Sequence, residues 1–154
     1  MYKVQSIANT FLQFAKEDEK SIDHLKIQKL VYIAYGIYAG VTGNKLFKED
    51  IKAWPHGPVI EPLYHEAKHF GSEPFDPDFR FKNDEFEPAT ILEETSDERS
   101  AIILTWERYR DDTGWELRNR THESNTPWSD TKQCEAIPFD HIRIYYEILL
   151  RVKG

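Results

Sequence analysis

The stretch that decides the fold is residues 23–43, which read DHLKIQKLVYIAYGIYAGVTG. Asp23 can cap the free amides of a helix, and Ile22 can pack on Ile27 as a hydrophobic staple. Gly43 is a natural C-terminal stop. Apolar residues form one stripe along this helix, and others widen the apolar surface, so we predict that it is the central, most buried helix. The stripe and its extensions are Ile27, Leu30, Val31, Ala34, Ile37 and Val41, with Leu25, Ile33 and Tyr35.

Further helices are predicted on both sides of this one. Helical spacing of apolar residues marks a first helix over residues 4–17 and a final helix over residues 139–152. Ser96 begins another helix, and Thr113-Gly114-Trp115-Glu116 has the form of a capping box, so a short helix should run to about His122. Residues 73–89 contain three prolines among four phenylalanines and predict an irregular surface crossing.

The segment 45–59 reads differently, because its apolar residues do not follow helical spacing. We expect a loop with a short extended segment that ends at Trp54, followed by a turn at Pro55-His56-Gly57-Pro58. Pro58 suits the first position of a helix and Gly57 its cap. His56 would then lie at a helix N-terminus whose free amides could bind an anion. The alternative is that His56 hydrogen-bonds a neighbouring carbonyl and positions the turn.

Length and composition narrow the class of protein. The 154 residues fit one domain, expected to span residues 1–154, and no repeat is visible. Acidic residues outnumber basic ones by 27 to 20, and a net charge of -7 repels phosphate backbones, so we expect no nucleic-acid partner. No apolar run could span a bilayer, and the start lacks a signal-peptide core, so we expect no membrane partner. A lone Cys134 suits a reducing compartment, and a cytoplasmic location is expected.

One motif suggests an enzyme. Residues 65–69 match the zinc protease pattern H-E-x-x-H on a predicted helix. His65 and His69 could hold zinc, and Glu66 could activate its water. However, Lys68 would place a positive charge between the ligands, the histidines lie opposite the apolar face, and no third ligand is marked. A zinc-dependent hydrolase is therefore the alternative function, and we expect no catalytic residue and no metal site.

The four tryptophans are either core residues or interaction anchors. Trp106 lies on the inner face of its helix and is predicted to be core. The others border turns and histidines, so core and shared surface pocket both remain open for them. We predict that the stretch containing His56 lies close in space to the stretch containing His122, as one partner-binding site. Its candidate residues are Trp54, His56, Gly57, Pro58, Trp115, Thr121, His122 and Trp128.

Three separated signatures, in order, resemble the Panacea domain, also called the SocA-like antitoxin domain. The first is Leu25-Lys26-Ile27-Gln28-Lys29-Leu30-Val31-Tyr32. The second is Ala53-Trp54 with His56-Gly57-Pro58-Val59 and Leu63-Tyr64. The last is Trp115-Glu116-Leu117 with Thr121-His122 and Pro127-Trp128. The resemblance covers nearly the whole chain, although Ile27 stands where leucine is usual and an extra Ser-Asn precedes Thr126.

The resemblance implies a mainly α, compact, single-domain helical fold with a small β element. It implies an antitoxin that neutralises a cognate toxin, encoded beside it, by direct protein contact. For some relatives it implies an adaptor that delivers the toxin to a protease. It implies neither a cofactor nor catalysis.

Overall fold

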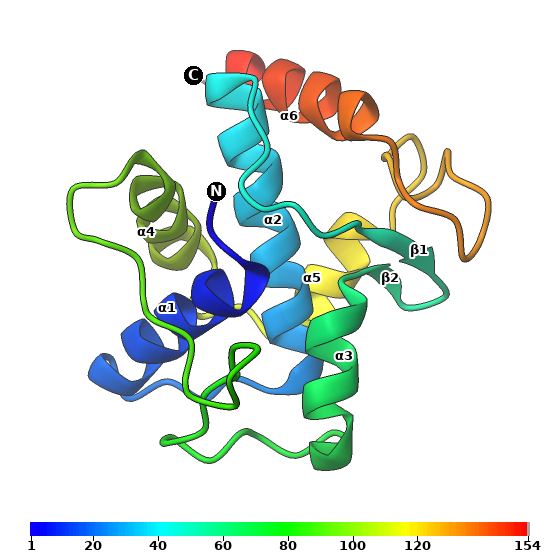
Figure 1. The fold of residues 1–154 in the computed structure, drawn as a ribbon. Helices are drawn as coiled ribbons and strands as arrows, with labels where there is room; N and C mark the ends of the chain where they lie inside the picture. The colour runs from blue at the N-terminus through cyan, green and yellow to red at the C-terminus, as the bar shows by residue number, and fades with distance from the viewer. Residues whose placement is uncertain (154) are drawn as a thin grey trace.

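The protein is described here from a computed structural model, which describes residues 1–153. The chain is mainly α-helical with one small antiparallel sheet, as expected (Figure 1). In chain order the elements are α1 (Val4–Glu17), α2 (His24–Thr42), β1 (Lys52–Trp54), β2 (Gly57–Val59), α3 (Glu61–Ala67), the 3₁₀ turn η1 (Lys68–Phe70), α4 (Asp97–Tyr109), α5 (Gly114–Thr121) and α6 (Phe139–Lys153). Among the described residues, no helix is both long enough and apolar enough to cross a membrane.

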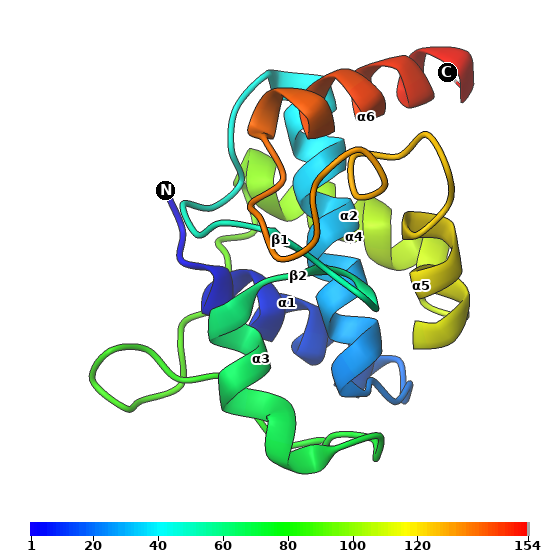
Figure 2. The ribbon, with the colours of Figure 1, turned by 90° about the vertical axis from the view of Figure 1, so that its right-hand side faces the viewer.

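Helix α2 is the centre of the core, which confirms the prediction from its apolar surface. Every residue from 26 to 39 is buried. The Asp23 carboxylate accepts a hydrogen bond from the Lys26 amide at 2.8 Å and so caps the first turn. Gly43 ends the helix with a φ of 76°, a left-handed conformation that favours glycine. Helices α1, α4, α5 and α6 all pack against α2 (Figures 1 and 2).

Two glycines of α2 allow α6 to approach closely. A Cβ added at Gly36 would lie 2.2 Å from the Tyr146 ring, and one added at Gly40 would lie 2.9 Å from the backbone nitrogen of Glu147. Neither space could hold a methyl group without movement of α6. The small residues therefore set the distance between the two helices.

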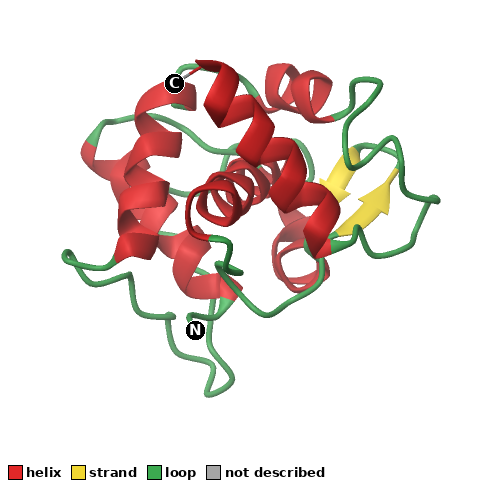
Figure 3. Ribbon diagram, turned by 90° about the horizontal axis from the view of Figure 1, so that it is seen from above, coloured by secondary structure: helices red, strands yellow, loops and turns green. Residues whose placement is uncertain are grey.

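The hairpin corrects one prediction. Residues 57–59 form strand β2, which pairs with β1 in the register Lys52↔Val59, Ala53↔Pro58 and Trp54↔Gly57. No helix begins at Pro58; α3 begins at Glu61, after Ile60 as its N-cap, with Pro62 in its first turn. The prediction was wrong because proline and glycine also suit a tight hairpin, and pairing with β1 outweighed the helix-start preference. The two strands lie at the edge of the molecule (Figure 3).

A third segment extends the hairpin on its other edge. The Ala53 amide donates to the Glu135 carbonyl at 2.9 Å, and the Ile137 amide donates to the Ile51 carbonyl at 2.7 Å. The loop between α5 and α6 therefore returns beside β1 before α6 begins (Figure 2). This loop brings Trp128 to the hairpin.

The crossing after α3 is irregular, as predicted, and two buried phenylalanines anchor it. Phe75 and Phe81 are buried, and their rings pack with Phe70 and Phe79. The buried Asn9 amide on α1 donates to the carbonyls of Phe81 and Ala89, each at 2.9 Å. The predicted caps of the next helices are also confirmed: Ser96 caps α4, and a Thr113–Glu116 capping box begins α5.

Candidate functional site

The hairpin turn is fixed from one side by two aromatic side chains. The Nε2 nitrogen of His122, at the end of α5, lies 2.7 Å from the Pro55 carbonyl oxygen and donates to it. The indole nitrogen of Trp128 donates to the Trp54 carbonyl oxygen, also at 2.7 Å. The two rings stack with their centroids 3.6 Å apart. The turn is therefore held as a unit with the end of α5.

Two polar residues of α2 also bond to the hairpin and its exit. The Gln28 amide group accepts from the Ile60 backbone nitrogen at 2.8 Å and donates to the Ile60 carbonyl at 3.1 Å. The ammonium of Lys29 donates to the Pro58 carbonyl at 2.9 Å. Both side chains belong to the first of the three sequence signatures. Together they attach β2 and the residue that follows it, Ile60, to α2.

Gly57 allows this attachment. Its φ is 102°, which L side chains rarely adopt, and an added Cβ would lie 3.2 Å from Cε and 3.3 Å from Nζ of Lys29. The same Cβ would lie 3.5 Å from the hydroxyl of Thr121, which is buried and donates to the Leu117 carbonyl. Glycine at this position therefore lets α2, α5 and the hairpin meet.

A pocket of about 460 Å³ opens between the hairpin, α2, α3 and α5. We call it the hairpin pocket. Its lining residues are Asp23, His24, Leu25, Gln28, Lys29, Trp54, His56, Val59, Tyr64, Gly71, Ser72 and Trp115. The Trp54 and Tyr64 rings meet edge to face at 4.8 Å, and His24 lies 5.1 Å from Tyr64. Aromatic side chains thus form much of the pocket wall and pack against one another.

The electrostatics of the hairpin pocket are unusual, because a lysine lies fully buried in its lining. Lys29 is 0% exposed, and burial, assisted by the positive charge of Arg118, lowers its pKa from 10.5 to about 7. Burial also lowers the pKa of His24, and the charge of Lys29 adds to the effect. Arg118 itself lies over the Trp115 ring, 4.7 Å from its centroid.

The two sequence stretches predicted to converge do adjoin. Trp54, His56 and Trp115 line the hairpin pocket. His122 and Trp128 hold the hairpin turn and do not line the pocket. Thr121 lines a separate cavity of about 170 Å³ between α2, α5 and α6. Gly57 and Pro58 supply backbone contacts to Lys29.

His56 is exposed in the turn and is followed directly by strand β2, so the prediction of an anion site at a helix N-terminus is wrong. The carbonyl contact that positions the turn comes instead from His122. Trp106 is core as predicted, with its indole nitrogen donating to Asp18 at 2.7 Å.

Of the lining residues, the sequence analysis proposed only Trp54, His56 and Trp115 as site residues; it missed, among others, the polar and aromatic residues His24, Gln28, Lys29 and Tyr64. Gln28, Lys29 and Tyr64 stood in the signatures, but periodicity marks them only as interruptions of an apolar pattern. A lysine in a helix that is apolar on all sides was the available signal, because such a helix leaves it no exposed face.

The residues of the zinc motif do not fit a metal centre. A Glu66 carboxylate oxygen accepts from the Lys82 amide at 2.6 Å, so this carboxylate does not lie free to activate water. His65 is exposed and faces Glu61, and His69 lies beyond the end of α3 in the 3₁₀ turn. No group of three or more His, Cys, Asp or Glu side chains among the described residues is arranged to hold a metal ion.

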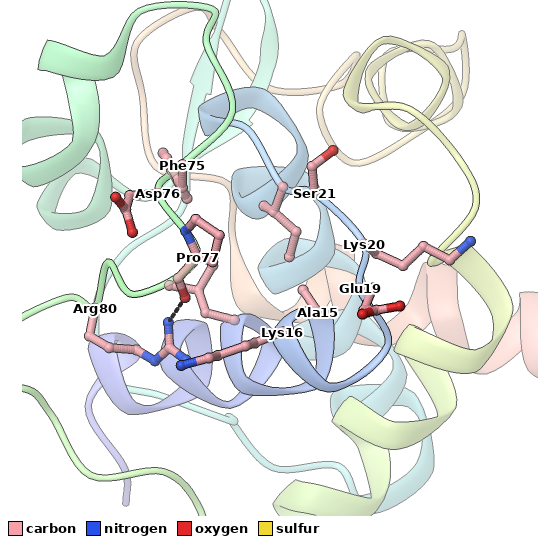
Figure 4. A pocket seen from close by; sticks show the side chains of 11 residues that line it. Ala15, Lys16, Glu19, Lys20, Ser21, Phe75, Asp76, Pro77 and Arg80 are labelled. Carbon is pink, nitrogen blue, oxygen red and sulfur yellow. Dashed lines mark hydrogen bonds between the residues drawn. The ribbon is translucent and has the colours of Figure 1, made fainter.

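A second depression, of about 360 Å³, lies between the end of α1 and residues 75–80 (Figure 4). Three cations line it, but each already has a partner. Lys16 pairs with Asp78 at 2.7 Å, and Lys20 pairs with Asp111 at 2.8 Å. The Arg80 guanidinium donates to the Pro77 carbonyl at 3.0 Å. The three cations of this depression are therefore already engaged within the protein.

Comparison with known proteins agrees with this architecture. No curated protein and no solved structure matches the chain significantly. The family model of the antitoxin SocA-like, Panacea domain matches residues 27–129. The matched residues contain α2 from Ile27 onward with its buried Gln28 and Lys29, the hairpin, and the His122 and Trp128 side chains that hold it. Because this match covers well over half of the chain, the protein belongs to the SocA-like antitoxin family, through its Panacea domain.

Proposed function

We propose that this protein is an antitoxin that neutralises a cognate toxin, encoded beside it, by direct protein contact at the hairpin pocket. The observation that carries the proposal is Trp115, which is 57% exposed beside a concave aromatic pocket. Binding energy in protein interfaces concentrates in a few aromatic anchors and the pockets they border. The family match supports the antitoxin role, and the exposed indole beside the pocket supports this surface as the proposed contact site.

The support behind the pocket suits this function. The hairpin is held by Gln28 and Lys29 from α2, and by His122 and Trp128 from the end of α5 and the loop after it. A surface that is rigid before binding loses less conformational entropy when it binds, so more of the contact energy appears as affinity. No reacting group is needed for this kind of neutralisation.

We further propose that the domain comprises residues 1–154, beyond the matched residues 27–129. Helices α1 and α6 both lie outside the match, yet both pack on α2. A chain cut to the matched residues would expose the apolar faces of α2. The proposed compartment is the cytoplasm, where the toxin would be made.

The test is co-expression with the product of the neighbouring gene. Wild-type protein should relieve the toxicity of that product and co-purify with it. Trp115→Ala should weaken rescue and complex formation, because it removes an exposed anchor. Phe86→Ala is the matched control, since Phe86 is 83% exposed on the irregular crossing far along the chain from the pocket elements. Circular dichroism verifies that both variants fold.

The level of toxin separates two modes of neutralisation. Masking predicts that toxin accumulates in the complex, whereas delivery to a protease predicts that toxin disappears and returns in a protease-deficient host. Absence of a complex with any neighbouring gene product would overturn the antitoxin proposal. If Trp115→Ala left rescue unchanged, the toxin would contact a surface other than the hairpin pocket.

A further inference from the structure

The small cavity between α2, α5 and α6 has no role in the function proposed above. Its volume is about 170 Å³, and we call it the tyrosine cavity. Tyr32, Tyr109, Tyr145 and Tyr146 line it together with Arg120 and Glu123. Arg120 and Glu123 are exposed, so the cavity reaches the surface beside them.

The tyrosine rings are arranged as walls around this space. The Tyr32 and Tyr146 rings lie 6.2 Å apart with their planes at 72°, and the Tyr145 and Tyr146 rings lie 5.2 Å apart at 78°. The face of an aromatic ring is negative and attracts a cation placed over it. One ring of the cavity already makes such a contact, because the guanidinium of Arg120 lies 5.8 Å from the centroid of Tyr109.

Two tyrosine hydroxyls leave hydrogen-bonding capacity unused in this cavity. Burial raises the pKa of Tyr32 and of Tyr146, so both hydroxyls stay protonated and uncharged near neutral pH. Within residues 1–151, whose side chains the structure describes, neither hydroxyl has a hydrogen-bond partner. A hydroxyl oxygen accepts hydrogen bonds, and a buried hydroxyl without a partner is unfavourable. The cavity therefore favours a ligand that donates hydrogen bonds.

The accessible charge without a partner in this lining is negative. The positive charge of Arg120 is balanced by Asp112, whose carboxylate lies 3.6 Å from the guanidinium Nε. Glu123 forms no ion pair with any side chain that the structure describes. Burial, assisted by the negative charge of Glu123, raises the pKa of Tyr145, so this carboxylate acts on the tyrosine wall. The lining therefore attracts a cation and repels an anion.

We propose that the tyrosine cavity binds one alkylammonium group of about the size of a lysine side chain, with the ammonium among the tyrosine rings and near the Glu123 carboxylate. At about 30 Å³ for each water-sized atom, the cavity holds a short alkyl stem and its ammonium. The broader, planar guanidinium of an arginine fits this volume less well. Either a lysine of a partner protein or a free amine supplies this chemistry. The proposal goes beyond the antitoxin function, since the cavity is separate from the hairpin pocket.

The first experiment titrates the full chain with three small probes of similar length, followed by NMR of the tyrosine ring signals. The probes are n-butylammonium, neutral 1-butanol and anionic butanoate. We expect n-butylammonium to shift the Tyr32 and Tyr146 signals and to bind about tenfold more tightly than 1-butanol. Butanoate should bind more weakly than either. Equal binding of the ammonium and the alcohol, or tighter binding of butanoate, would overturn the proposal.

A charge-removing substitution tests the role of the carboxylate. Glu123→Gln should remove most of the preference for n-butylammonium over 1-butanol, and its exposed position makes unfolding no explanation for the loss. Glu94→Gln is the matched control, because Glu94 is also exposed and carries the same charge, but does not line the cavity. Equal effects of the two substitutions would mean that the overall acidity of the protein attracts the cation, and the proposed site would be wrong.

A fourth probe, N-acetyl-lysine N-methylamide, identifies the source of the ammonium. Binding at least as tight as that of n-butylammonium would assign the cavity to a lysine of a partner protein, whereas binding of the free amine alone would assign it to a small amine. Tighter binding of N-acetyl-arginine N-methylamide than of the lysine probe would overturn the choice of an ammonium. None of these measurements uses the toxin, so their outcome is independent of the proposed function.

Discussion

Replacing Lys29 with methionine tests whether the burial of this ammonium sets the pH dependence of stability. Lys29 is fully buried, and its pKa falls from 10.5 to about 7 on folding. The unfolded chain therefore binds more protons than the folded chain between these two pKa values, and stability rises with pH across that window. Since each pH unit in the window is worth about 1.4 kcal/mol, the whole effect of Lys29 amounts to roughly 5 kcal/mol.

The assay is urea unfolding at a series of pH values between about 7.5 and 9.5, with tryptophan fluorescence as the signal. Relative to Lys29→Met, the free energy of unfolding of the wild-type protein should increase by about 3 kcal/mol across this range. The variant loses the ammonium but keeps a side chain of similar length. The Pro58 carbonyl loses its donor, which costs about 1–3 kcal/mol at every pH and so does not affect the slope.

Other groups also change their pKa on folding, but their effects on stability cancel when wild type is compared with Lys29→Met. Burial raises the pKa of Tyr35 and of Tyr32, which lowers stability above about pH 10 in both proteins. Burial also lowers the pKa of Lys26, but nearby Asp23 and other carboxylates oppose the shift, so Lys26→Met should change the slope less. A difference between wild type and Lys29→Met that stays constant with pH would refute the reasoning, because Lys29 would then remain charged in the folded protein.

Two other substitutions test the packing described above. Gly36→Ala should lower the free energy of unfolding by about 1–3 kcal/mol, because the new methyl group would meet the Tyr146 ring. The control Val41→Ala, at a 70% exposed position on the same helix, should change this free energy by less than about 0.5 kcal/mol. Equal effects of the two substitutions in thermal unfolding would contradict the argument that Gly36 permits the close approach of α6. Trp128→Phe should keep an aromatic ring but remove the donor to the Trp54 carbonyl, which should cost about 1 kcal/mol of stability. Hydrogen exchange of the β1 and β2 amides should become faster. Unchanged exchange would show that the indole does not hold the hairpin.

Periodicity and end signals predicted most of the helical fold. The caps at Asp23, Ser96 and Thr113 are local, since each side chain bonds an amide three residues ahead. Local signals of this kind can be read from sequence because the interacting groups are fixed by chain geometry. The same local signals predicted a helix start at Gly57 and Pro58, where the structure has a hairpin, because proline and glycine suit both. Only the partner strand decides between them.

The candidate site was predictable in part for the same reason. The signatures marked Trp54, His56 and Trp115, which do line the hairpin pocket. The signatures could not tell which side chains line the pocket and which support the hairpin, because both kinds look alike in sequence. His122 and Trp128 hold the turn through bonds to carbonyls more than sixty residues away, and such contacts leave no local pattern.

The hairpin is the part of the fold that needs the most outside support. A two-stranded sheet of three residues per strand is at best marginally stable in water by itself. Here side chains from α2, α5 and the following loop bond four carbonyls of the hairpin and its exit, those of Trp54, Pro55, Pro58 and Ile60. Because the carbonyls are satisfied by three separate segments, the hairpin cannot move without breaking bonds to all of them. The wall that the hairpin gives to the pocket is therefore fixed by tertiary hydrogen bonds rather than by its own short ladder.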